Sequence, residues 1–207
     1  MAELALILYA AYLLLAFGLR TLIQLRRTGS TGFHGLGGRP GSAEWIAGVG
    51  FTVALLVGAA APVLALLDVV EPIAALDTSA AHVAGLILAV GGIGLTFYAQ
   101  VAMGASWRIG VDPAERTQLV TTGPFALVRN PIFAAMQPTA LGLTLLVPSW
   151  VALVGFAGLV VALELQVRVV EEPYLLRAHG SAYATYAARV GRFLPGIGRL
   201  RRAEFTA

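Results

Sequence analysis

Five long apolar segments constrain this chain more than any other feature. They cover Leu4–Leu25, Trp45–Leu67, Ala80–Met103, Ile132–Val147 and Trp150–Val167. A helix crosses a bilayer with about 20 apolar residues, and the first three segments reach that length. Only Pro148-Ser149 separates the last two, which predicts a tight helical hairpin. Either this hairpin spans a thinned or locally polar region, or its second helix continues past Val167 into Arg168–Glu172.

The composition agrees with a membrane protein. Of 207 residues, 58% are hydrophobic and 12% are charged, whereas a soluble domain carries about 25% charged residues. We therefore predict an all-α integral membrane bundle of about five transmembrane helices. Residues 1–103 would form three of them with a Gly-rich inner loop, and residues 104–207 would form a second region that includes the hairpin, residues 131–167. The chain has no cysteine, which excludes disulfides, zinc–thiolate sites and a cysteine nucleophile.

The basic residues are all arginine, and their distribution predicts an orientation. With the N-terminus outside and five crossings, all 14 arginines fall on the cytoplasmic side. They are Arg20, Arg26, Arg27 and Arg39 in the first inner loop, Arg108, Arg116 and Arg129 in the second, and Arg168, Arg177, Arg189, Arg192, Arg199, Arg201 and Arg202 in the tail. An outer loop carries Asp68, Glu71 and Asp77. The positive-inside rule thus predicts an outer N-terminus and a cytoplasmic C-terminus, and we expect a bacterial inner membrane.

The formal charge of +3 does not indicate nucleic-acid binding. Arginines along the cytoplasmic face pair with anionic lipid headgroups, so membrane lipid is the expected partner. Three histidines, His34, His82 and His179, lack the spacing of metal ligands, and no metal is expected. The Gly-rich residues 26–44 are interpreted as a flexible connector. Small residues at Gly91, Gly92 and Gly94 predict close helix packing.

Two polar stretches flank the predicted hairpin, Thr122–Pro131 before it and Arg168–Tyr174 after it. Ionisable groups beside a membrane segment are costly, so they usually pair with each other or serve a site. Helical spacing places Glu164, Arg168, Glu171 and Glu172 on one face, as either an ion-pair network or a site.

The flanking backbone also carries breaks and caps. Asn130 is expected to cap a helix that begins at Pro131. Pro173 is expected to kink the following helix, and Gly180 to interrupt it.

Taken together, these residues follow a recognisable order. The pattern consists of Gly123-Pro124-Phe125, Arg129-Asn130-Pro131, Phe133, Arg168, Glu171-Glu172, Leu175, Gly180, Tyr183, Tyr186, Arg189 and Pro195. It resembles the isoprenylcysteine carboxyl methyltransferase family and the related phospholipid N-methyltransferases. The resemblance covers about Ser106–Pro195, and its order, spacing and intervening hairpin together make it specific. The main departure is Asn130, where the family usually has histidine.

The resemblance implies a methyltransferase that binds S-adenosylmethionine in a cytoplasmic pocket roofed by the C-terminal helices. A lipophilic or lipidated acceptor would reach it sideways from the membrane. The residues that would bind the cofactor are Gly123, Pro124, Phe125, Val128, Arg129, Asn130, Pro131, Phe133, Gln100, Glu172, Tyr183 and Tyr186. The residues expected to act in catalysis are Arg168, Glu171, Glu172, Arg189 and Asn130.

The acceptor is expected to be a carboxylate. Its methylation needs alignment and charge complementarity rather than a base, because the nucleophile is already anionic. Arg168 or Arg189 would hold the carboxylate. An amine acceptor would need a base, for which Glu171 or Glu172 is the local candidate. The sequence also leaves open a membrane reductase of the sterol type that binds NADPH, and a non-enzymatic membrane scaffold. It predicts no oligomeric state.

Overall fold

The computed structural model describes residues 1–33, 35, 37–110 and 118–200, and every regular element in that part of the chain is helical. The elements are α1 (Ala2–Leu13), η1 (Leu14–Leu19), α2 (Arg20–Thr28), α3 (Ala43–Leu66), α4 (Ser79–Ala102), η2 (Gly104–Ser106), η3 (Gly123–Ala126), α5 (Pro131–Leu146), α6 (Trp150–Leu165), η4 (Gln166–Glu171), α7 (Glu172–His179) and α8 (Ser181–Arg189). The all-α prediction is therefore confirmed. His34, Arg116, Arg201 and Arg202, which the sequence analysis named, lie outside the described residues.

The first membrane helix runs from Ala2 to Thr28 through α1, the π-helical η1 and α2. Directly after η1, the fully buried Arg20 donates hydrogen bonds to the carbonyl oxygens of Gln100, at 3.3 Å, and Gly104, at 2.5 Å. Its guanidinium also lies 4.5 Å from the centroid of the Trp107 ring. These contacts fasten the C-terminal end of the first helix to that of α4.

Three later helices begin at the residues that the local chemistry favours. Ser42, Thr78 and Ser149 precede α3, α4 and α6, and each side-chain oxygen accepts a hydrogen bond from the backbone three residues on. Such caps satisfy amide groups that the first turn of a helix leaves unpaired. Pro131 opens α5 as predicted, but Asn130 makes no side-chain cap, so that expectation is wrong.

The predicted hairpin is formed by α5 and α6, and its two helices differ in length. α5 has 16 residues, or about 24 Å, which is less than a bilayer core of about 30 Å. α6 instead continues through η4 and α7 as one helix from Trp150 to His179. The second of the two options for the hairpin therefore holds for α6. Four described helices are long and apolar enough to cross a membrane, and α5 is a shorter apolar fifth.

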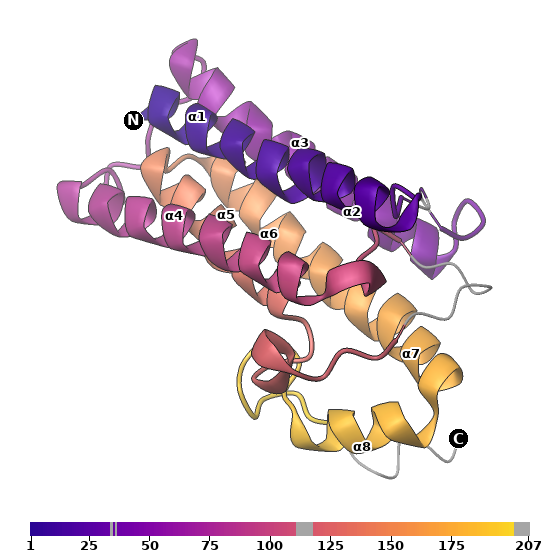
Figure 1. The fold of residues 1–207 in the computed structure, drawn as a ribbon. Helices are drawn as coiled ribbons and strands as arrows, with labels where there is room; N and C mark the ends of the chain where they lie inside the picture. The colour runs from indigo at the N-terminus through magenta and orange to yellow at the C-terminus, as the bar shows by residue number, and fades with distance from the viewer. Residues whose placement is uncertain (34, 36, 111–117, 201–207) are drawn as a thin grey trace.

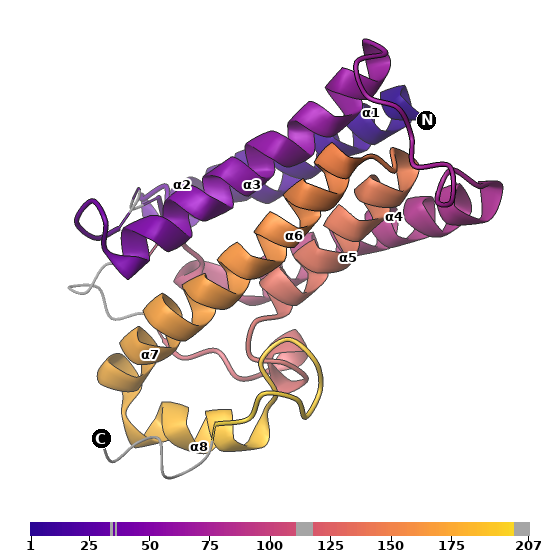
Figure 2. The same ribbon diagram turned by 180° about the vertical axis from the view of Figure 1, so that it is seen from behind.

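The helices pack mainly in two pairs, α4 along α5 and α3 along α6, and α1 runs alongside α3 (Figures 1 and 2). A methyl group on Gly92 would collide with Thr139 and Ala135 of α5, so α4 and α5 approach closely here. Gly91 and Gly94 face open space, and the packing role predicted for these three glycines holds for Gly92.

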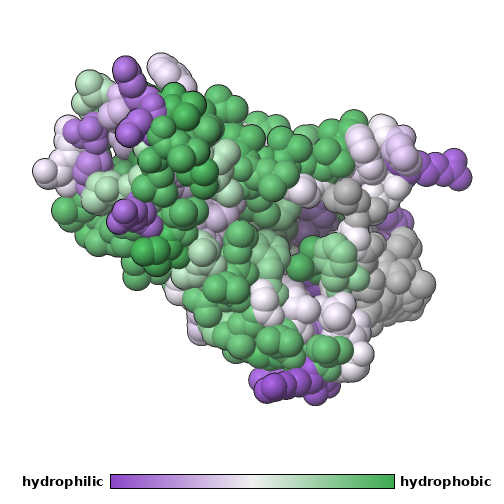
Figure 3. All heavy atoms as spheres, turned by 90° about the horizontal axis from the view of Figure 1, so that it is seen from above, coloured by the Kyte–Doolittle hydropathy of each residue, from purple (hydrophilic) through white to green (hydrophobic). Residues whose placement is uncertain are grey.

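Large apolar side chains cover the outside of the bundle (Figure 3). Ile7, Leu14, Leu56, Ile87 and Val154 are each more than 60% exposed. A soluble protein rarely leaves so continuous an apolar surface in water, whereas lipid tails cover it without cost. The protein is thus an integral membrane protein.

The chain folds back across one end of the bundle after α7. Gly180 ends α7 with φ of 52° and ψ of −127°, and α8 then runs beneath α4 and α5 beside η3 (Figure 1). The predicted break at Gly180 is confirmed. Pro173 lies in the first turn of α7, directly after the π-helical η4, and the helix continues through it. The wider π turn accommodates a residue that cannot donate a backbone hydrogen bond.

Candidate active site

A cavity of about 530 Å³ lies between the folded-back C-terminal segment and the bundle. We call it the chamber. Its charged side chains are Glu44, Arg108, Arg129, Glu171 and Arg177. Its opposite end reaches between the membrane helices, where Tyr12, Phe17, Phe51, Leu55 and Met136 line it. A ligand that fills the chamber would meet charges at one end and hydrocarbon at the other.

Nine of the residues predicted for the site line this chamber. They are Gln100, Phe125, Arg129, Asn130, Pro131, Phe133, Glu171, Tyr183 and Tyr186. They come from α4, η3, the link between η3 and α5, the start of α5, η4 and α8, so the fold gathers segments that are far apart in sequence. Six predicted residues are not among those that line it: Gly123, Pro124, Val128, Arg168, Glu172 and Arg189.

Glu172 lies at the centre of a buried ion-pair cluster beside the chamber. Its Oε1 accepts hydrogen bonds from Arg129 Nη2 at 2.5 Å and Arg192 Nε at 2.8 Å, and its Oε2 accepts one from Arg192 Nη2 at 2.9 Å. The Glu172 carboxylate also raises the pKa of Arg192. Two arginines thus already occupy the carboxylate that the sequence assigns to cofactor binding.

Arg129 extends this cluster into the C-terminal segment. It donates hydrogen bonds to the carbonyl oxygens of Ala187 at 2.9 Å, Val190 at 2.6 Å and Gly198 at 3.0 Å. The side chain of Arg129 is 1% exposed, so these bonds are shielded from water. We call Arg129, Glu172 and Arg192 the lock, because together they hold α8 and the following loop against the bundle.

The backbone next to Arg129 joins the same assembly. The Arg129 amide donates to the Gly191 carbonyl at 2.8 Å, and the Asn130 amide donates to the Arg192 carbonyl at 3.1 Å. The Asn130 side chain also donates to the Arg192 carbonyl, at 3.3 Å. Asn130 is therefore a bridge to the C-terminal segment at the edge of the chamber.

Two tyrosines of α8 close the chamber. The Tyr186 hydroxyl donates to the Phe125 carbonyl at 2.6 Å, and Tyr183 is 1% exposed. Burial raises the pKa of Tyr186 to about 12, although Arg129 opposes this, and burial also raises the pKa of Tyr183. Both phenols remain neutral near pH 7, so they shape the site and donate hydrogen bonds rather than accept protons.

Glu171 faces the chamber, although it directly precedes Glu172 of the lock. Adjacent helical residues project about 100° apart, so two neighbouring carboxylates can serve different surroundings. The Gln166 side chain hydrogen-bonds to Glu171, and Arg108 lies close enough to interact with its charge. Glu164 and Arg168 pair one turn apart on the surface, as their spacing predicts, whereas Glu171 lines the chamber and Glu172 is buried in the lock, so the four residues do not share one face.

The two arginines predicted to hold an acceptor carboxylate lie on the surface. Arg168 is 58% exposed and pairs with Glu164 one turn earlier, at 2.5 Å between Nε and Oε2. Arg189 is exposed at the end of α8. The placement of both residues outside the chamber lining leaves their predicted role without structural support.

Sequence reasoning missed several residues of the chamber. Arg108 and Arg177 line it, and the Arg108 guanidinium lies 5.0 Å from the centroid of the Tyr174 ring. One available signal was the position of Arg108 just beyond an apolar segment. Gly35, Gly37 and Gly38 of the supposed connector also line the chamber. That loop is held in place because Ile109 donates a backbone hydrogen bond to the Gly32 carbonyl at 2.7 Å.

The comparisons with known proteins bear on this region. The phospholipid methyltransferase family matches residues 80–182, from the start of α4 to the start of α8. The chain belongs to the phospholipid methyltransferase family. The match contains the chamber residues of α4, η3, α5, η4 and α7 and stops just before Tyr183. A nickel-cobalt-cadmium resistance protein, NccN, of Alcaligenes xylosoxydans xylosoxydans is 28% identical over 125 residues. The matched residues are 60% of this chain and 56% of that relative, so the chain spans little more than half of its length.

A metal site does not emerge from the described residues. In that part of the chain, no three His, Asp or Glu side chains gather as metal ligands would. The relative is named for resistance to metals, but residues 1–33, 35, 37–110 and 118–200 of this chain contain no cluster of metal ligands. The family and the chamber are the findings on which a function can be built.

Proposed function

We propose that the protein transfers a methyl group from S-adenosylmethionine to a lipidic or lipid-attached acceptor in the chamber. The observation that carries the proposal is the position of the chamber. It combines charged residues of the family-matched region with an apolar end between membrane helices. This arrangement suits a reaction between a polar cofactor and a lipophilic substrate.

The residues present fit such a cofactor. A volume of about 530 Å³ lies within the range of small-molecule pockets, about 300–1,000 Å³. Glu171 supplies an anionic acceptor for an ammonium or ribose hydroxyl group, and Phe125 and Tyr183 supply aromatic surface. When bound, S-adenosylmethionine supplies an electrophilic methyl group. The lock then acts as a positioning device, because it holds α8 over the chamber without offering a free carboxylate.

For the acceptor we propose a carboxylate group. Arg177 and Arg108 are the chamber cations best placed to orient it, in place of the expected Arg168 and Arg189. A bound carboxylate needs no base, and exclusion of water by the C-terminal segment would favour its attack on the methyl group. The absence of a histidine at position 130 agrees with this chemistry.

A phospholipid amine is the second candidate acceptor, and the name of the matched family favours it. Such an acceptor must lose a proton before or during methyl transfer. Glu171 is then the base, because Glu172 is held by Arg129 and Arg192. Both candidates use the same chamber and differ in what Glu171 does.

Two measurements test the proposal. Isothermal titration calorimetry on purified protein should detect binding of S-adenosylmethionine or of its demethylated product. Glu171→Gln should weaken binding roughly tenfold to a hundredfold, because a charged hydrogen bond is worth about 1.5–3 kcal/mol. Glu164→Gln, at the exposed pair with Arg168, is the matched control and should bind like wild type. A wild-type protein that binds neither compound would refute the enzyme assignment.

The acceptor is identified by mass spectrometry of membrane lipids and small molecules after incubation with cofactor labelled in its methyl group. A labelled ester supports the carboxylate acceptor, and a labelled amine supports the phospholipid acceptor. Asn130→His separates the two chemically. With a carboxylate acceptor, activity should persist without a new titration near pH 6.5, the usual pKa of histidine. A sharp rise in turnover that follows imidazole ionisation would show that proton removal limits the rate.

A further inference from the structure

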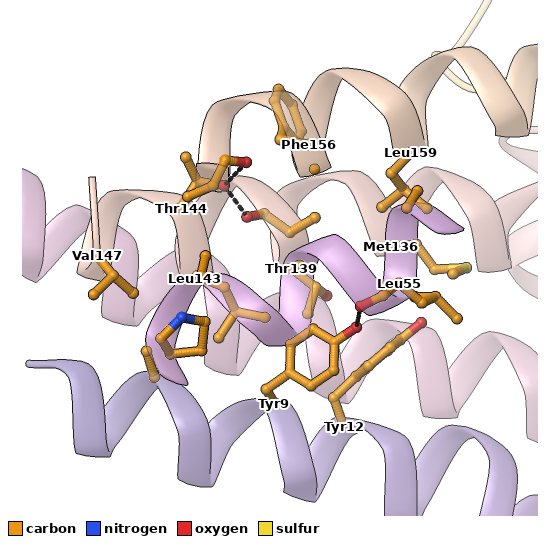
Figure 4. A pocket seen from close by; sticks show the side chains of 18 residues that line it. Tyr9, Tyr12, Leu55, Met136, Thr139, Leu143, Thr144, Val147, Phe156 and Leu159 are labelled. Carbon is orange, nitrogen blue, oxygen red and sulfur yellow. Dashed lines mark hydrogen bonds between the residues drawn. The ribbon is translucent and has the colours of Figure 1, made fainter. Parts of the chain in front are cut away.

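A second cavity adjoins the apolar end of the chamber. It lies between α1, α3, α5 and α6, and Tyr12, Leu55 and Met136 line both cavities. We call this second cavity the crevice and those three residues the junction. In Figure 4, Tyr9 and Tyr12 project from α1 toward Leu55, while Met136 lies beside them. The two cavities are therefore neighbours, and these three side chains lie between them.

The crevice is apolar in effect. None of its lining residues is charged. The hydroxyls of Tyr9, Thr139 and Thr144 point to backbone carbonyls, those of Leu55, Ala135 and Ala140 respectively, at 2.6, 2.9 and 2.9 Å. The protons of these hydroxyls are already donated, so none of the three has a hydrogen bond left to donate to a polar ligand. The lining suits hydrocarbon.

The crevice is small, but its lining residues extend over two turns of α1. Its lining extends from Tyr12 back to Ala5 along α1, which is about 10 Å at 1.5 Å per residue. Its volume of about 40 Å³ compares with the 10–15 Å³ that one water-sized sphere requires by the same kind of measure. The space holds a few methylene groups in a single row, whereas two chains or a fused ring system do not fit.

The junction carries a further sign of a ligand. The Tyr12 side chain is 4% exposed, and within the described part of the chain its hydroxyl has no hydrogen-bond partner. It lies where the lining changes from the chamber to the crevice. A buried hydroxyl without a partner is uncommon in native proteins. An ester, ether or amide oxygen at this depth would accept its hydrogen bond.

We propose that the crevice binds the distal part of one unbranched aliphatic chain of the acceptor, whose reacting head lies in the chamber. This proposal rests on the proposed function and deepens it by naming the substrate class, a single-chain amphiphile. The tail lies inside the bundle rather than in the surrounding lipid. Transfer from lipid into the crevice gains little hydrophobic free energy, since both are apolar. Its selectivity comes from filling a void of fixed length.

In this proposal, Gly58 sets the length of chain that the crevice accepts. It lines the crevice, and a methyl group on it would lie 3.4 Å from Cε2 of Tyr9, an ordinary contact distance. The three atoms nearest to such a methyl group all belong to the Tyr9 side chain, so a larger side chain at position 58 would press on Tyr9 in the crevice rather than on backbone. Gly91 of α4 is a matched control, because a side chain there meets nothing within 4 Å.

Photocrosslinking tests the location of the tail. The full-length protein is reconstituted in phosphatidylcholine nanodiscs with a palmitate analogue that carries a diazirine at its terminal carbon. We expect the main cross-links on crevice residues such as Tyr9 and Thr139, and we expect excess palmitate to suppress them. A shorter octanoate analogue should label the junction instead. Cross-links confined to lipid-facing residues such as Leu14 and Leu56, for both analogues, would overturn the proposal.

The variants test the residue that sets the length. Gly58→Leu should shift the palmitate cross-links from Tyr9 to the junction and leave octanoate labelling unchanged, whereas Gly91→Leu should behave like wild type. If Gly58→Leu fails to fold, the milder Gly58→Ala still tests the role of Gly58, and the wild-type cross-links still test the location of the tail. Palmitate labelling of Tyr9 that is unaffected in a folded Gly58→Leu protein would refute the role of Gly58.

The two proposals can fail separately. Labelling of the crevice in a protein that binds no S-adenosylmethionine would support the crevice and refute the methyltransferase assignment. Methylation of an acceptor without any labelling of the crevice would support the methyltransferase assignment and refute the crevice as a binding site for the tail.

Discussion

At the residue scale, the most informative contrast is between two adjacent glutamates. Glu171 lines the chamber, whereas Glu172 binds Arg129 and Arg192 in the lock beside it. A carboxylate with two arginine partners is a poor ligand for a third group, because binding would require breaking a buried ion pair. We infer that Glu172 organises the site and that Glu171 contacts what occupies it.

This contrast predicts different effects for two substitutions. Glu172→Ala leaves Arg129 and Arg192 buried without their anion, and we expect a loss of about 3–5 kcal/mol of unfolding free energy. Glu164→Ala breaks only the exposed pair with Arg168, with an expected effect of about 0–1 kcal/mol. Thermal unfolding in detergent and limited proteolysis of residues 180–200 measure both. Equal stability of the two variants would show that the lock contributes little.

At the element scale, close helix packing and the π turn before Pro173 decide the architecture. Gly85 and Gly92 of α4 face Gly142 and Thr139 of α5, where added side chains would meet backbone. η4 changes the direction in which the residues after it project. Both features act on whole helices, and so their effects reach residues far from the position that causes them.

We predict that Gly142→Leu separates α4 from α5. A side chain at position 142 would strike the backbone of Ala89 and Gly85, and overpacking of this kind costs about 1–3 kcal/mol or more. Gly91→Leu is the matched control, since position 91 faces open space. The apparent Tm of each purified variant is the measurement, and a Gly142→Leu protein as stable as the control would contradict the packing described.

Deletion of Val169 tests the π turn. A π turn holds one residue more than the corresponding α-helical turn, so the deletion should restore α-helical geometry. Because a π turn rotates less per residue than an α turn, the loss of one residue and the return to α-helical geometry nearly cancel, and Glu172 should still face Arg129. We expect normal membrane insertion and a C-terminal segment that resists proteolysis as in wild type, and Val169→Ala, which keeps the chain length, should resist as well. Rapid proteolysis of the deletion variant alone would show that η4 does not absorb an extra residue.

At the scale of the whole molecule, the chamber lies at the end of the bundle where α8 folds back (Figure 1). The described arginines gather toward this end, and Asp68, Glu71 and Asp77 lie in the opposite connection between α3 and α4. We propose the orientation that the distribution of arginines predicts, with an outer N-terminus and a cytoplasmic C-terminus. This orientation would expose the chamber to the compartment that contains S-adenosylmethionine.

Reporter fusions measure the orientation directly. A fusion at position 73, between α3 and α4, should report the outer side, and a fusion at the C-terminus should report the cytoplasm. The positive-inside rule is the physical basis, because arginine-rich segments resist translocation. Opposite results at both positions would show that the protein has the inverse orientation and that the chamber faces away from the cytoplasm.

The sequence by itself determined the helical class, the five apolar helices and the break at Gly180. In lipid a long apolar segment must satisfy its own backbone hydrogen bonds, so it has few alternatives to a helix. The sequence also located the segments that form the site, and nine predicted residues line the chamber.

The tertiary structure alone decided which charges face the chamber. It placed Arg108 and Arg177 there rather than Arg168 and Arg189, separated Glu171 from Glu172, and brought the Gly-rich loop over the site. These outcomes depend on the rotation of one helix through η4 and on bonds such as that from Arg129 to Gly198, 69 residues away. Local sequence patterns describe the residues along one helix. The side on which a charge lies depends on neighbours that folding brings from elsewhere in the chain.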